Sequence, residues 1–123
     1  MDEDVLVQYV LMRDDLETNG KPWNRGSLIA QACHACISAV SVYSTDPNVI
    51  RYISPENLPV MRTVVLSVAS ETELNSYHSL LLSHGVNNHL FTEQPENIIT
   101  CLATAPVQKS RIYSLVKNLK LFK

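Results

Sequence analysis

The sequence predicts an α/β fold in which helices cover a mixed β-sheet. Apolar runs of strand length alternate with longer helical segments in the order β-α-β-α-β-β-α, a pattern typical of sheets covered by helices. Of the 123 residues, 46% are hydrophobic, which is ample for one core. The length falls within the usual range for one domain, and no internal repeat or low-complexity stretch divides the chain. We therefore expect a single domain over residues 1–123.

The first half of the chain predicts a strand, a loop and a long helix. Residues 5–12 (VLVQYVLM) form an apolar, β-branched run that suits a buried strand. Residues 13–25 contain Asp, Asn, Gly and Pro and predict a loop. Residues 26–43 are rich in alanine and predict a helix. Residues 46–60 hold three prolines and predict a short helix followed by a loop.

The second half begins with a strand at residues 63–68 (TVVLSV). Ser70 and Glu73 have the spacing of a capping box, and Gly85 supplies a stop, so a helix is expected from Ser70 to about His84.

Two strands and a helix complete the predicted elements. Residues 86–92 and 98–105 predict strands joined by a turn at residues 94–97, and a last helix is expected over residues 108–119.

The composition argues against export and against a membrane span. No apolar run approaches the roughly 20 residues that cross a bilayer. The N-terminus, Met1 to Asp4, is acidic, whereas a secretory signal starts with basic residues. The three cysteines are an odd number and are expected to be reduced thiols in a cytoplasmic protein.

Charge is unevenly distributed along the chain, although the net charge is only −2. Six acidic residues and one basic residue occur up to Glu17, whereas five basic residues and no acidic one follow Pro106. This asymmetry indicates either a face that meets an anionic partner or a solvated helix face.

The predicted helix over residues 26–43 carries a narrow polar stripe. At about 100° per residue, five polar side chains share one side of the helix: Ser27, Gln31, His34, Ser38 and Ser41. The remaining residues from Leu28 to Val42 are apolar, so we expect the helix to be buried on most sides. The stripe should then face a cleft, water or a polar partner, because unpaired buried polar groups cost about 1–3 kcal/mol each.

Gln31 and His34 lie one helical turn apart, so their side chains can act on the same small volume. Together they could hold and polarise a water molecule. The alternative is a structural polar seam in which the histidine bonds to a backbone carbonyl.

Three further side chains invite other interpretations. Cys33 and Cys36 flank His34, but they share a helical face from which His34 points away, so small packed thiols are favoured over a metal site or a cysteine nucleophile. Trp23 could stack on a base or cover the core, and the second role is favoured.

Two motifs resemble the N-terminal signature of the type II peptidyl-tRNA hydrolase family. They are Arg13-x-Asp15-Leu16 and Gly26-x-x-x-Ala30-Gln31-x-x-His34-Ala35. The resemblance extends through the strand order to the ending at residues 119–123. The segment from Glu93 to Ile98 is similar to one branch, the peptidyl-tRNA hydrolase domain-containing protein 1 group.

The resemblance implies an enzyme that cleaves the ester between a peptide and the terminal ribose of tRNA. It implies a mixed four-stranded sheet in a three-layer α/β/α sandwich, a homodimer, peptidyl-tRNA as the partner, and neither a metal nor an organic cofactor. The implied catalytic residues are Gln31, His34 and Glu93, and the implied substrate-binding residues are Arg25, Ser27, Asp15, Asn97 and Lys109.

The sequence departs from the family at three of these positions. Ser27 stands where the family has its functional lysine, and Lys21 in the preceding loop is a candidate substitute. Glu93 opens a shorter turn than the family's aspartate does, and Asn97 replaces a threonine there. The alternative to a hydrolase is therefore a catalytically weak or inactive module that binds tRNA or a protein on the same fold.

Overall fold

The computed structural model describes residues 5–123, so the acidic segment Met1–Asp4 lies outside the described residues. The elements in chain order are β1 (Leu6–Arg13), β2 (Glu17–Thr18), β3 (Lys21–Pro22), α1 (Arg25–Val42), α2 (Pro47–Tyr52), the 3₁₀ helix η2 (Leu58–Val60), β4 (Thr63–Val68), α3 (Glu71–Ser83), β5 (Asn88–Glu93), β6 (Ile98–Thr104), β7 (Val107–Gln108) and α4 (Lys109–Val116). The predicted order of long strands and helices is confirmed. The short strands β2, β3 and β7 add to it.

The main sheet has the order β4-β1-β6-β5 and is mixed, as predicted. Strand β1 runs parallel to β4 and antiparallel to β6, which in turn pairs antiparallel with β5. The two-residue strand β7 pairs with the start of β1 and brings the sheet to five strands, one more than expected.

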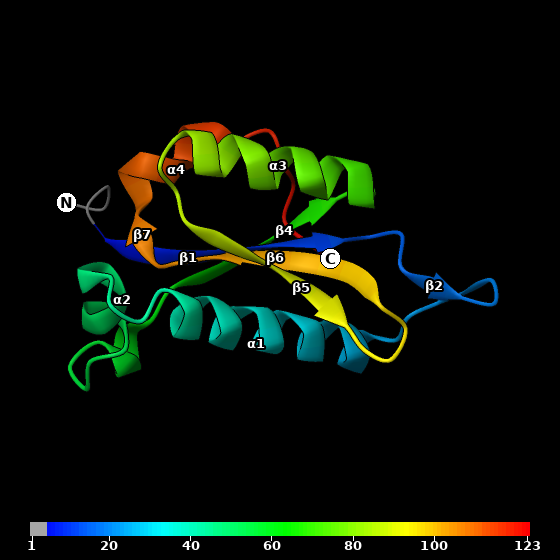
Figure 1. The fold of residues 1–123 in the computed structure, drawn as a ribbon, viewed down its shortest axis with the longest axis horizontal. Helices are drawn as coiled ribbons and strands as arrows, with labels where there is room; N and C mark the ends of the chain where they lie inside the picture. Colours follow the sequence, from blue (N-terminus) through cyan, green and yellow to red (C-terminus); the bar gives the residue numbers. More distant parts are fainter. Residues whose placement is uncertain (1–4) are drawn as a thin grey trace.

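Helices cover both faces of this sheet and form the predicted three layers (Figure 1). The alternating direction of the β1 side chains explains the three layers, because successive side chains of a strand point to opposite faces of the sheet. Val7 and Leu11 pack in the cluster that also holds residues of α3 and α4. Val10 and Met12 point the other way and pack with Ala35 of α1.

Helix α1 is more exposed than its composition predicts. Ile29 and Ile37 are 58% and 69% exposed, so the expectation of a helix buried on most sides is wrong. The buried line of α1 consists of Gln31, Ala35 and Ala39, at intervals of four residues. As the outer layer on one face of the sheet, the helix has a single face covered.

The caps of α3 are confirmed. The Ser70 hydroxyl accepts a hydrogen bond from the Glu73 amide at 3.2 Å, and the Glu73 carboxylate accepts one from the Ala69 amide at 2.7 Å. Gly85 follows the helix with φ +75°, the left-handed conformation typical of a helix stop.

The last helix is shorter than predicted. It ends at Val116, and the chain then returns to the sheet. The Lys120 carbonyl accepts a hydrogen bond from Ser67, and the Phe122 amide donates one to Val65. This tail thereby covers the outer edge of β4. Among the helices within residues 5–123, none is long and apolar enough to cross a membrane.

Candidate active site

A polar cleft of about 290 Å³ lies where the β2–β3 hairpin, the start of α1 and the β5–β6 turn meet. Its lining combines one cationic side chain, two carboxylates and two hydroxyls, with further polar and ring groups. The residues are Thr18, Lys21, Pro22, Trp23, Asn24, Ser27, Glu93 and Glu96. A cation and carboxylates around one small hollow are the groups from which acid–base and electrostatic catalysis are built.

The β2–β3 hairpin places Lys21 in this cleft. Asn19 and Gly20 have φ of +53° and +80°, which defines the two-residue turn that Asn-Gly favours in hairpins. Thr18 and Lys21 therefore face each other across the turn, and side chains of such a pair lie on the same side. The predicted loop over residues 13–25 thus contains a hairpin, which the Asn-Gly dipeptide could have revealed.

Trp23 anchors the hairpin to the rest of the molecule. Its indole Nε1 donates a hydrogen bond to the Thr18 hydroxyl at 2.9 Å, and its main-chain amide donates to the Leu16 carbonyl at 3.0 Å. Its half-buried ring packs against the core cluster that contains Leu16 and Ala35. Trp23 therefore lines the cleft and also packs on the core.

The first turn of α1 supplies Ser27. The Asn24 side chain caps the helix by accepting a hydrogen bond from the Ser27 amide at 2.8 Å. This cap fixes the orientation of the turn and leaves the half-buried Ser27 side chain against the cleft. Arg25, two positions before Ser27, lines a neighbouring cleft instead.

Glu93 is the last residue of β5 and lines the polar cleft from the side of the β5–β6 turn. The following turn contains Asn97 at φ +60°, and the Asn97 carbonyl oxygen Oδ1 accepts a hydrogen bond from Gln94 Nε2 at 3.3 Å. The Asn97 side chain thus closes the turn, whereas Glu93 and Glu96 from the same turn line the cleft.

Gln31 points into the sheet. It is only 2% exposed, and its side-chain oxygen accepts a hydrogen bond from the Thr100 hydroxyl at 2.8 Å. Thr100 is the extra residue of a bulge in β6, because Phe91 pairs with Cys101 whereas Thr92 pairs with Ile99. A bulge breaks the alternation of side chains, so both Thr100 and Cys101 face α1.

His34 lies on the surface, with its ring stacked on Phe91 of β5 at a centroid distance of 5.3 Å. Within the described residues 5–123, neither His34 nor Gln31 lines the polar cleft or its larger neighbour. The predicted polar stripe is therefore divided among a cleft, a buried contact and an exposed stack.

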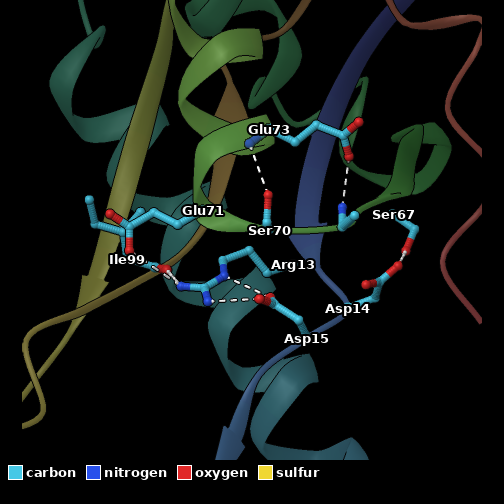
Figure 2. Close-up of polar contacts among 9 residues, drawn as sticks. Arg13, Asp14, Asp15, Ser67, Ser70, Glu71, Glu73 and Ile99 are labelled. Atoms are coloured by element: carbon cyan, nitrogen blue, oxygen red, sulfur yellow. Dashed lines mark hydrogen bonds and ion pairs between the residues drawn. The ribbon is translucent and has the colours of Figure 1, made fainter.

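Asp15 is paired with Arg13, as Figure 2 shows. Both carboxylate oxygens accept hydrogen bonds from the guanidinium, at 2.9 and 3.1 Å. These hydrogen bonds from Arg13 lower the pKa of Asp15, although partial burial opposes the shift. The same guanidinium donates to the Ile99 carbonyl at 2.8 Å and lies 3.6 Å from Glu71. The Arg13-x-Asp15 motif therefore joins the end of β1 to β6 and α3.

Lys109 is at the other end of the sheet. Its amide bonds to Val5, and the adjoining β7 pairs with Leu6 and Val7, whereas the cleft adjoins the segment that follows the end of β1. A strand of eight residues is about 26 Å long, so Lys109 is separated from the cleft by roughly that length. Its ammonium lies 5.8 Å above the Tyr113 ring.

The three cysteines occupy different environments. Cys33 is exposed, whereas burial raises the pKa of Cys36 to about 11 and that of Cys101 to about 12. No group of three or more His, Cys, Asp or Glu side chains in the described part of the chain could hold a metal ion.

Comparison with known proteins identifies the family. The model of the family "Peptidyl-tRNA hydrolase PTH2" matches residues 6–122. "Putative peptidyl-tRNA hydrolase PTRHD1" from Mus musculus and its Homo sapiens counterpart are each 39% identical over 119 residues, which cover 97% of this chain and 84% of the relative. The "Peptidyl-tRNA hydrolase" of Methanothermobacter thermautotrophicus is 31% identical over 121 residues, 94% of this chain and 99% of the relative.

The identities agree with the motifs of the sequence, which resemble the whole family and, in one segment, one branch of it. They are higher with the two mammalian relatives, as the segment from Glu93 to Ile98 predicts, and they extend at a lower level to the archaeal relative. The chain therefore belongs to the type II peptidyl-tRNA hydrolase family, PTH2.

Proposed function

We propose that this protein is a peptidyl-tRNA hydrolase, which cleaves the ester between a peptide and the terminal ribose of tRNA. The observation that carries the proposal is the polar cleft, where Lys21, Ser27 and Glu93 from three separate segments come together in a member of this family. Ester hydrolysis needs a base that activates water and a positive group near the developing oxyanion. The cleft offers both.

In the proposed reaction, the Glu93 carboxylate accepts a proton from water as the water oxygen attacks the ester carbonyl. The Lys21 ammonium stabilises the negative charge that develops on the carbonyl oxygen. Ser27 cannot take this role because its hydroxyl carries no positive charge. When the bond to the ribose oxygen breaks, the proton passes to that oxygen. The carboxylic acid formed on the peptide then ionises and releases its proton to water. The products are a free peptide carboxylate and a tRNA with its ribose hydroxyl restored.

The other predicted residues take supporting roles in this proposal. Gln31 holds α1 against the β6 bulge through Thr100, which positions the turn that carries Ser27. Asp15 and Asn97 fix the segments on either side of the cleft through Arg13 and Gln94.

His34 and Lys109 are assigned to RNA contacts outside the cleft. His34 exposes its ring beside β5, and Lys109 lies at the far end of the sheet, where it could meet only a distant phosphate of the tRNA. The homodimer and the cytoplasmic location stay predictions.

The test is hydrolysis of an N-blocked aminoacyl-tRNA by the purified protein. The wild type should release tRNA, and Glu93→Gln should slow release about 10²–10⁴-fold, as expected for the loss of a general base. Glu56→Gln, an exposed carboxylate outside the cleft, is the matched control and should keep full activity. Tight tRNA binding with no release by the wild type would show instead a binding module.

A further inference from the structure

A second, larger cleft adjoins the polar one. It has a volume of about 610 Å³, and Trp23 lines both clefts. Leu28, Ile29 and Ala32 contribute one face of α1 to it, at the helical spacing of a single stripe. Ser27, the residue before Leu28, faces the polar cleft. The two clefts therefore lie on adjacent sides of the same helical turn.

The walls of this second cleft are mostly apolar. Val65 of edge strand β4 lines it, and so does Phe122 from the C-terminal tail. The hydrogen bond from the Phe122 amide to the Val65 carbonyl, 2.9 Å long, holds the tail in place as a wall. Figure 1 shows this tail descending from α4 to the sheet.

The charge of the second cleft is opposite to that of the first. Its charged lining residues are Arg25 and Lys123, and within residues 5–123 no carboxylate side chain lines it. The polar cleft, in contrast, has two carboxylates, Glu93 and Glu96, against one cation, Lys21. A ligand matched to the second cleft therefore has an apolar body and a negative group at its rim.

We propose that this apolar cleft binds the C-terminal residue of the peptide, with an apolar side chain against Leu28 and Ala32. The carboxylate that hydrolysis creates then faces Arg25. The inference rests on the proposed function, because it assigns the two clefts to the two chemically different halves of one substrate. The part of the nucleotide half next to the ester is the terminal ribose, which is uncharged and carries hydroxyl groups, whereas aliphatic side chains occur only in the peptide half. The ester carbonyl and the side chain belong to the same residue, so the reacting carbon lies at the boundary between the two clefts, where Trp23 lines both.

Cys33 offers a direct readout, because it is exposed and lines this cleft. With the thiol pKa raised to about 11 in Cys36 and about 12 in Cys101, a maleimide near pH 7.5 should modify Cys33 first. We would follow modification of the full chain by mass spectrometry, with N-acetyl-L-leucine as the probe. A ligand of this size is expected to bind with a Kd on the order of 1 mM.

At a concentration about ten times Kd, the probe should slow modification of Cys33 about tenfold, because mass action leaves about one-tenth of the clefts open. N-acetylglycine, which has no apolar side chain, should protect far less. N-acetyl-L-leucinamide, which has no carboxylate, should also protect less. Arg25→Gln should remove the difference between the acid and the amide, whereas Arg51→Gln, an exposed arginine on α2, should keep it.

Three results would overturn the inference. They are no protection by N-acetyl-L-leucine, equal protection by the acid and the amide, or protection by adenosine monophosphate alone, which would assign the cleft to the tRNA end. Glu93→Gln separates this inference from the proposed function. In this variant, N-acetyl-L-leucine should still protect Cys33 although hydrolysis is lost. If the wild type shows protection of Cys33 but no hydrolysis, only the proposed enzyme activity is rejected. If it shows hydrolysis but no protection, only the peptide site is rejected.

Discussion

Lys21 lies directly opposite Thr18 across the Asn19–Gly20 turn, and both side chains face the polar cleft. This pairing depends on two residues with positive φ, a conformation that costs most side chains about 1 kcal/mol or more. The placement of the positive charge in the cleft is thus determined by a turn rather than by a long element.

Gly20→Val should therefore impair hydrolysis more than it impairs folding. Gly20 has φ +80° with no atom near its missing Cβ, so the substitution strains the backbone without a clash. The expected loss is about 1–2 kcal/mol of local turn stability, with a fall in kcat/KM because Lys21 is displaced. Gly26→Ala is the matched control. Its added Cβ would meet Asn24 at an ordinary 3.6 Å, and urea unfolding should show no loss of stability. Wild-type kcat/KM in Gly20→Val would contradict the role of the turn.

The buried contact between Thr100 and Gln31 should contribute to stability. Gln31→Leu leaves the buried Thr100 hydroxyl without its acceptor, and such a loss costs about 1–3 kcal/mol. The double variant with Thr100→Val should recover part of this loss, since both polar groups are then removed. Urea denaturation of the two single variants and the double variant measures the coupling. Strict additivity would show that the hydrogen bond contributes nothing.

The Arg13–Asp15 pair should make stability depend on pH. Because the pKa of Asp15 is lowered in the folded state, the ionised carboxylate stabilises the fold above the unfolded pKa near 3.8, and this contribution is lost as the pH falls through the folded pKa. Asp15 is partly exposed, so Asp15→Asn should cost only about 0.5–1 kcal/mol at pH 7.

The cost of Asp15→Asn should shrink below about pH 4 in urea unfolding curves taken across the acid range. The exposed Glu17 provides the control, and Glu17→Gln should change stability little at neutral pH. A cost for Asp15→Asn that stays constant down to pH 2 would show that the carboxylate is not coupled to folding in this way.

Hydrophobic pattern and capping chemistry were sufficient to predict the main elements. The apolar run of β1 and the spacing of Ser70 and Glu73 express local preferences that the fold retains. The exposure of α1 could not be predicted in this way. Composition showed an apolar helix, but only tertiary packing determines that Gln31 faces the sheet while Ile37 faces solvent.

The candidate site was less predictable because it depends on irregular geometry. The bulge at Thr100 directs a side chain toward Gln31, and the residue pattern of β6 does not predict this bulge. Helical spacing correctly placed Gln31 and His34 on neighbouring turns, yet it could not distinguish a buried side chain from one stacked on Phe91. The Asn19–Gly20 turn was visible in the sequence and would have placed Lys21 beside Thr18.

The proposed hydrolysis requires Lys21 to supply the positive charge that Ser27 cannot provide. The most direct measurement compares kcat/KM on an N-blocked aminoacyl-tRNA for Lys21→Met, the double variant Lys21→Met with Ser27→Lys, and Lys117→Met, an exposed lysine that follows α4. We expect Lys21→Met to lose about 10²–10³-fold, the double variant to recover at least about tenfold, and Lys117→Met to match the wild type. Full activity in Lys21→Met would show that Lys21 does not supply the charge on which the proposed hydrolysis depends.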